Sequence, residues 1–162
     1  MTSTITAPTA SLIVSNLRSI IKDYNYWGAS ESDSPLSIRR TKSLTDAQIL
    51  VADAAMRRKV GGANYQVPSN RSIACKTLLE VFTPLVESSK SEISAVMGTI
   101  ENLRLPAESL EFYVQLYSTF QQLTETKVCF VDAPNDAFVG LFIIGKAADN
   151  ELVVAQALLV QT

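Results

Sequence analysis

The sequence predicts a mainly α-helical protein, in which four to five packed helices precede a small C-terminal antiparallel β meander. Apolar residues recur at helical spacing through most of residues 8–124. After Lys127 the chain changes to short runs of β-branched and aromatic residues that are separated by turn residues. A length of 162 residues suits one domain with a single core. We therefore expect residues 1–126 to form a helical part and residues 127–162 a β part of one domain.

The first helix is expected over about residues 8–24. Pro8 suits its first turn, and Gly28 is the expected C-cap. Its apolar side chains recur at helical spacing (Leu12, Ile13, Leu17, Ile20 and Ile21). Residues 29–38 are polar and rich in serine, which predicts an exposed loop.

The second helix is expected to begin near Thr45, which can cap it, and to end at Gly61-Gly62. Three consecutive basic residues lie in its last turn, where cations interact favourably with the helix dipole (Arg57, Arg58 and Lys59). Consecutive helical positions point in different directions, so one of these side chains is expected over the edge of the core and two outward. Residues 61–70 predict a loop.

The longest helical pattern spans about residues 70–102, and Pro84 either kinks it or divides it into two helices. Its apolar positions include Ile73, Leu78, Leu79, Phe82 and Val86. Another helix is expected from Pro106 to about residue 124, with apolar positions that include Leu110, Tyr113, Val114, Leu116 and Tyr117.

The chain after Lys127 predicts short strands joined by turns. VCFVDA and AFVGLFIIG are separated by PND, and KAADN precedes the last apolar segment. That segment, ELVVAQALL, fits a strand or a buried helix equally well.

Charge is distributed unevenly along the chain. Residues 39–76 carry eight basic and two acidic side chains, whereas residues 77–162 carry four basic and eleven acidic ones. Such a chain can bind copies of itself through its opposed regions, with Arg39, Arg40, Arg57, Arg58 and Lys59 as the expected contacts. This pattern predicts a subunit of a larger homo- or hetero-oligomer. The alternative is a coat-like or regulatory protein whose basic segment binds nucleic acid or another polyanion.

The chain contains no histidine, which removes the commonest general base and the commonest zinc ligand. We therefore expect a non-enzymatic protein with no metal site. Cys75 and Cys129 lie in apolar surroundings without metal-ligand spacing, so we expect reduced, buried thiols in a cytoplasmic protein, with one disulfide as the alternative. No apolar run is long enough to suggest a membrane span.

A series of short segments lies between residues 19 and 106: SIIKDYNYWG (19–28), SLTDAQILVADAA (43–55), GGANY (61–65), Arg71-x-x-Ala74-Cys75 and Leu103-x-x-Pro106. Their order resembles the consensus of the phycobiliproteins, especially allophycocyanin-like subunits. The resemblance implies a light-harvesting subunit with a globin-like helical array, a bilin joined to Cys75 by a thioether, and Arg71 near a bilin propionate. It places Asn64 and Tyr65 in the preceding loop. The family follows its cysteine with Leu-Arg-Asp, whereas Lys76-Thr77-Leu78 follow here.

Overall fold

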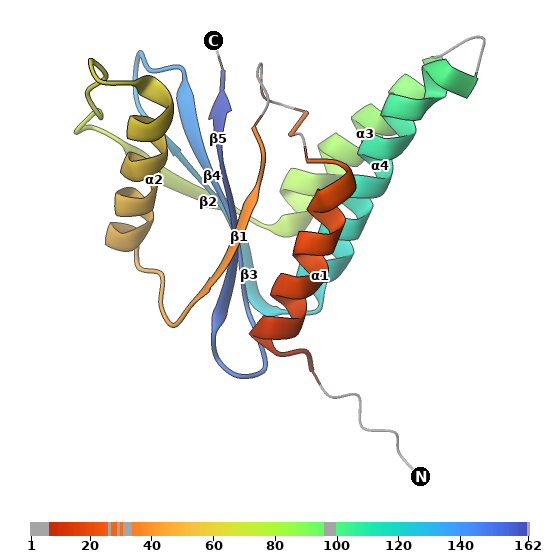
Figure 1. The fold of residues 1–162 in the computed structure, drawn as a ribbon, viewed down its shortest axis with the longest axis horizontal. Coiled ribbons are helices and arrows are strands. Elements are labelled where there is room, and N and C mark those ends of the chain that lie inside the picture. Colours follow the sequence, from red (N-terminus) through yellow and green to blue (C-terminus); the bar gives the residue numbers. More distant parts are fainter. Residues whose placement is uncertain (1–6, 26, 29, 31–33, 96–99, 162) are drawn as a thin grey trace.

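The computed structural model describes residues 7–25, 27–28, 30, 34–95 and 100–161. These residues form an α+β fold in which helices pack on both faces of an antiparallel sheet (Figure 1). The elements in chain order are α1 (Ala10–Asp23), β1 (Ser37–Thr41), α2 (Asp46–Gly61), β2 (Ser72–Lys76), α3 (Leu78–Ala95), α4 (Ile100–Gln121), β3 (Thr124–Asp132), β4 (Phe138–Lys146) and β5 (Leu152–Val160).

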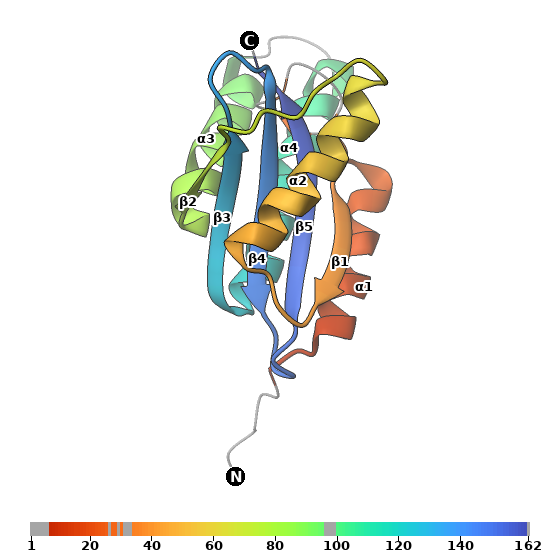
Figure 2. The same ribbon diagram turned by 90° about the vertical axis from the view of Figure 1, so that its left-hand side faces the viewer.

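The sheet has five strands in the order β1-β5-β4-β3-β2, and all neighbours are antiparallel (Figure 2). The long strands β3, β4 and β5 are consecutive and form its centre, while the short strands β1 and β2 form its edges. Residues 139–145 of β4 are buried throughout, because helices cover both faces of the sheet at this strand. Burial on both faces explains why the sequence of β4 is continuously apolar rather than alternating.

The helices are divided unequally between the two faces of the sheet. Helices α1, α3 and α4 lie on one face, and α2 lies alone on the other (Figures 1 and 2). The three-helix face covers the larger apolar core, which includes Leu17, Trp27 and Phe120. The core beneath α2 is smaller and is formed by Ile49, Cys129, Val131, Phe142, Ile144 and Val154.

The predicted fold class is wrong, because the sheet is larger than a C-terminal meander. The meander exists as β3, β4 and β5, but two further strands come from the part expected to be helical or loop. Residues 37–38, predicted as loop, lie in β1, and residues 72–76, predicted as helix, form β2. Both are five residues long and pair on one side only, so hydrogen bonds with β5 and β3 determine their conformation rather than their own periodicity. The description of the protein as helical is corrected accordingly.

The first two predicted helices are confirmed, with small shifts at their ends. The hydroxyl of Thr9 accepts a hydrogen bond from the Leu12 amide at the start of α1, which ends at Asp23, before the predicted Gly28. Thr45 caps α2 as predicted and forms a capping box with Gln48.

The two proline-containing patterns are helical, but neither proline marks a boundary. Pro84 lies inside α3, so it does not divide the helix, and Pro106 lies inside α4, which begins at Ile100. Residues 96–99 of the predicted helical pattern over residues 70–102 lie outside the described residues. The ambiguous C-terminal segment is strand β5. Among the described residues, no helix combines the length and hydrophobicity needed to cross a membrane.

Candidate functional site

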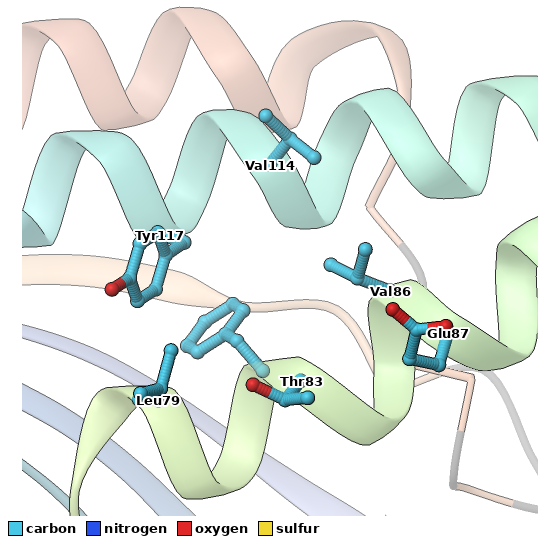
Figure 3. A pocket seen from close by; sticks show the side chains of 7 residues that line it. Leu79, Thr83, Val86, Glu87, Val114 and Tyr117 are labelled. Atoms are coloured by element: carbon cyan, nitrogen blue, oxygen red, sulfur yellow. The ribbon is translucent and has the colours of Figure 1, made fainter.

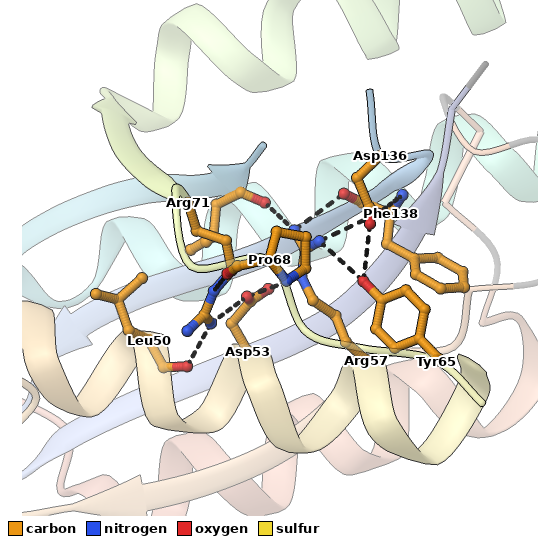
Figure 4. Close-up of polar contacts among 9 residues, drawn as sticks. Leu50, Asp53, Arg57, Tyr65, Pro68, Arg71, Asp136 and Phe138 are labelled. Carbon is orange, nitrogen blue, oxygen red and sulfur yellow. Dashed lines mark hydrogen bonds and ion pairs between the residues drawn. The ribbon is translucent and has the colours of Figure 1, made fainter. Parts of the chain in front are cut away.

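A cluster of charged side chains is buried between α2 and the end of the sheet where β3 and β4 meet (Figure 4). Arg57 is fully buried at its centre. Its Nε donates to Asp53 Oδ2 over 2.8 Å, and its Nη1 donates to Asp136 Oδ1 over 3.2 Å. Its Nη2 donates to the carbonyl oxygens of Val131 and Phe138 over 2.9 and 3.0 Å. Arg57 therefore ties α2 to two strands and to the turn between them.

Tyr65 extends this cluster from the loop after α2. Its hydroxyl donates to Asp136 Oδ2 over 2.9 Å and accepts a bond from Arg57 Nη1 over 3.4 Å. Burial raises the pKa of the Tyr65 phenol, and the bond to Asp136 raises it further, although Arg57 opposes the shift. Burial also disfavours the charge on Arg57, but Tyr65 and Asp53 outweigh it and raise the pKa of this guanidinium. Both groups therefore keep their protons at neutral pH.

Arg71 closes the cluster on the side of β2. Its Nη1 donates to Asp53 Oδ2 and to the Leu50 carbonyl, each over 2.8 Å, and its Nε donates to the Pro68 carbonyl over 2.8 Å. The second oxygen of Asp53, Oδ1, is buried and has no hydrogen-bond partner among the described residues. It lies against Gly140 of β4, where a Cβ would collide with it. The absence of a side chain at Gly140 makes room for the carboxylate.

The chemistry of this cluster is structural. Arg57 bonds to carboxylates, to a phenol and to backbone carbonyls through Nε, Nη1 and Nη2, and Arg71 bonds to a carboxylate and to backbone carbonyls through Nε and Nη1, so these donors already have partners inside the protein. Removing one partner of a buried ion pair leaves the other charge buried without a partner, which lowers the stability of the folded protein by about 3–5 kcal/mol. The cluster anchors α2 and the loop after it to the sheet.

The predicted anion and partner contacts divide into internal and external residues. Arg57, expected at a surface, is buried, while Arg58 and Lys59 are exposed, as predicted for two of the three consecutive cations. Arg39 donates to Gln156 Oε1 over 2.8 Å, and burial lowers the pKa of its guanidinium. Exposed Arg40 lies 3.6 Å from Glu151 Oε2. Arg40, Arg58 and Lys59 are thus the outward-facing cations of this set, and Arg40 is paired with Glu151.

The residues implied by the phycobiliprotein resemblance do not converge on one group. Tyr65 and Arg71 point into the buried cluster, and Asn64 is exposed in the preceding loop. Cys75 lies on edge strand β2, directly opposite Cys129 of β3, and the two form a disulfide. A thioether at Cys75 would therefore require prior reduction of this bond.

The disulfide also corrects the expectation of reduced thiols. Both cysteines of the chain are in this bond, so neither is a free thiol. Cys75 is exposed while Cys129 is fully buried. Because disulfides persist mainly in oxidising compartments, the expectation of a cytoplasmic location loses the support of reduced cysteines.

A hydrophobic groove runs between α3 and α4 on the side that faces away from the sheet (Figure 3). Its volume is about 250 Å³, and its lining residues are Leu79, Phe82, Thr83, Val86, Glu87, Val114 and Tyr117. Leu79 is 62% exposed and Val114 is 45% exposed, and both are apolar positions of the predicted helices. Because adjacent helical positions are about 100° apart, Leu78 faces the core and leaves Leu79 outside. The consecutive pair Leu78-Leu79 is therefore the feature of the sequence that indicates an exposed apolar side chain here.

The groove has an apolar end and an acidic end. A hydrogen bond of 3.0 Å between the Ser89 and Ser109 hydroxyls sets the register of the two antiparallel helices. Glu87 of α3 lines the groove beyond Leu79. In this register the exposed Glu111 of α4 lies level with Glu87, outside the lining residues and about 60° around α4 from Val114. The hairpin of residues 78–121 carries six acidic and two basic side chains. An apolar side chain followed by positive charge would complement this surface.

No known protein family and no curated protein matches this chain.

Proposed function

We propose that this chain is a non-enzymatic subunit of a protein assembly and that it binds its neighbour through the α3–α4 groove. The observation that carries the proposal is the exposure of Leu79 and Val114, at 62% and 45%, in one groove of about 250 Å³. Scattered exposed apolar side chains are common on monomers, whereas apolar side chains that share a concave surface are typical of docking sites. The groove therefore supports binding of a protein partner.

The energetics favour an apolar anchor from that partner. Complete burial of a valine or leucine side chain contributes about 1.5–3 kcal/mol. Leu79 and Val114 do not gain much of this stabilisation in the isolated subunit, because both side chains are largely exposed to water. An interface that covers both would gain enough to change affinity by more than tenfold.

The acidic surroundings of the groove favour a basic partner. Residues 78–121 have a net charge of −4, and Glu87 lines the groove itself. Complementary charge increases association rates and discriminates against acidic partners, and salt screens the attraction. The uneven charge along the sequence thus supports an electrostatic contribution to assembly.

Binding of nucleic acid through the basic segment has weaker support. Arg57 and Arg71 bond to carboxylates inside the protein, and Arg39 bonds to Gln156. These cations are therefore engaged and do not line up on a surface for phosphate groups. Bound nucleic acid in the native material would appear as a raised ratio of absorbance at about 260 to about 280 nm.

The light-harvesting role implied by the phycobiliprotein resemblance is a narrower form of the same proposal. It requires a bilin on Cys75, whose sulfur is bonded to Cys129. Visible absorbance of the denatured native protein tests this form, because a thioether-linked pigment survives denaturation. A colourless protein whose mass equals the sequence mass would remove the bilin and leave the assembly subunit.

The decisive experiment is sedimentation velocity over a wide concentration range at low and high salt. Wild type should form oligomers that dissociate on dilution and at high salt. Leu79→Ser should weaken association by about tenfold or more, because it removes an apolar anchor from the groove. Leu12→Ser is the matched control, since Leu12 is 52% exposed on α1 and lies outside the groove. A wild-type monomer at all concentrations, or equal effects of the two substitutions, would contradict the proposal.

A further inference from the structure

The outward face of α2 carries a stripe that combines apolar and basic side chains. Val51 is 71% exposed, and Ala55, Arg58 and Lys59 are also exposed. Relative to Val51 these residues occupy positions i+4, i+7 and i+8, so they share one side of the helix. The opposite side of α2 holds Ile49 and Arg57 against the sheet. Val51 and Ala55 also line a pocket with Arg39 and Leu44 of their own subunit, but all four residues of the stripe remain exposed.

The α2 stripe and the α3–α4 groove lie on opposite sides of the molecule. Helix α2 covers one face of the sheet, and α3 and α4 cover the other (Figures 1 and 2). The sheet separates them, so α2 cannot enter the groove of its own subunit. Any contact between these two surfaces must join two copies of the chain.

The two surfaces match in length and in the order of their chemistry. Residues 51–59 of α2 and residues 79–87 of α3 span equal distances, about 12 Å at a rise of about 1.5 Å per residue. Each surface begins with an exposed apolar residue, Val51 or Leu79. The stripe then ends in cations and the groove in carboxylates.

The geometry points to α2 of a second copy as the occupant of the α3–α4 groove. This inference rests on the proposed function and names the partner surface. Val51 enters the apolar part of the groove, and Arg58 and Lys59 lie beside Glu87 and Glu111. Because each subunit offers one stripe and one groove on opposite sides, the contact is head-to-tail and continues from copy to copy.

The carboxylates at the acidic end are available for this contact. Glu87 lies 3.5 Å from Lys90, but both side chains are exposed, and such a pair contributes little. Glu111 accepts a hydrogen bond of 3.1 Å from the Gln115 side chain, which leaves its other oxygen for a cation. Arginine and lysine can therefore bind here without breaking a buried interaction.

A charge-swap experiment tests the proposed pairing. In the variant Arg58→Glu/Lys59→Glu both the α2 stripe and the groove are acidic. In the variant Glu87→Lys/Glu111→Lys both surfaces are basic. Each variant alone should therefore remain monomeric at concentrations where wild type assembles. An equimolar mixture should assemble again, because the groove of each variant then meets an α2 of opposite charge. Sedimentation velocity of the two variants and of their mixture measures this directly.

Two valines on α2 provide the matched apolar control. Val51→Asp should weaken wild-type association by about tenfold or more, because it puts a charge into the apolar part of the groove. Val60 is 59% exposed on the same helix but lies about 180° around it from Val51, so Val60→Asp should have no effect.

The outcomes separate this inference from the proposed function. If Leu79→Ser weakens assembly while the α2 variants do not, the groove binds another surface, and α2 as its occupant is wrong. If the mixture of charge variants stays monomeric, the pairing is wrong as well. If wild type never assembles, both the proposed function and the inference are overturned. If the two charge variants assemble only when they are mixed, the result supports both the proposed function and the inference.

Discussion

Substitution of Arg57 by methionine should destabilise the protein more than any other change to the basic residues of α2. Methionine keeps an unbranched apolar side chain but removes five donors. In Arg57→Met the carbonyls of Val131 and Phe138 lose the bonds that they accept from Nη2, and Asp136 and Asp53 lose a cation. Breaking a buried pair costs about 3–5 kcal/mol. Because Arg71 still donates to Asp53, we expect a loss near the lower end of this range.

The measurement is equilibrium unfolding in urea, followed by far-ultraviolet circular dichroism. A domain of this size has a stability of about 5–15 kcal/mol, so a loss of about 3 kcal/mol is a large share of it. With a slope of about 2 kcal/mol per molar urea, the midpoint should fall by about 1.5 M. Arg58→Met is the control, because Arg58 is exposed and surface changes stay within about 0.5 kcal/mol. Equal midpoints for the two variants would refute the structural role of the cluster.

Other predictions concern the disulfide, the cluster and its glycine. Replacing both Cys75 and Cys129 by serine should cost up to about 4 kcal/mol by the loop-entropy estimate for a separation of 54 residues, and urea unfolding with and without reductant measures this cost. Gly140→Ala should cost about 1–3 kcal/mol, because the new methyl group meets the Asp53 carboxylate, and a midpoint unchanged from wild type would contradict that contact. The Tyr65 phenol should titrate above its ordinary pKa of about 10 in the folded protein, as the ultraviolet difference between wild type and Tyr65→Phe can show. Since the folded state holds this proton more tightly, the stability that it contributes is complete below pH 10 and declines as the pH rises through the folded pKa.

The long elements could be predicted from the sequence because their local signals agree with the fold. Helix α2 has a capping box formed by Thr45 and Gln48, and the glycines that follow it end the helix. Strands β3 and β4 are apolar runs separated by turn residues, so their type was predicted correctly. Local sequence determines the type of such elements, while their partners in the sheet remain unspecified.

The edge strands could not be predicted in the same way. Strand β2 precedes α3, and its apolar residues fit the same helical spacing as those of α3. Only pairing with β3 makes this segment a strand. A local signal nevertheless marks the true start of α3. The Thr77 hydroxyl accepts a bond from the Glu80 amide, and the Glu80 carboxylate accepts bonds from Thr77, which is a capping box of the form Thr-x-x-Glu. A helix that begins after Thr77 leaves residues 72–76 outside it.

The buried cluster was missed because its members are distant in sequence. Asp136 comes from the β3–β4 turn and reaches Arg57 only after the sheet has formed. One part of the signal was local, since Ile49, Asp53 and Arg57 are spaced by four residues and lie on one side of α2. An acidic and a basic residue on the same side as a buried isoleucine indicate an internal ion pair. The prediction that Arg57 lies at the surface used only the number of charges along the chain and ignored this spacing.

The internal position of Arg57 also explains how α2 can present a binding surface. Few of its apolar side chains are fully buried, with Ile49 and Ala54 on the side toward the sheet. A helix held only by so narrow an apolar contact could rotate or tilt on the sheet. Arg57 fixes its C-terminal half through directional bonds to two strands and to the turn between them. The consequence is that Arg58, the next residue, points outward in a defined direction, so the ion pairs inside the protein orient the cation that we propose binds a second copy.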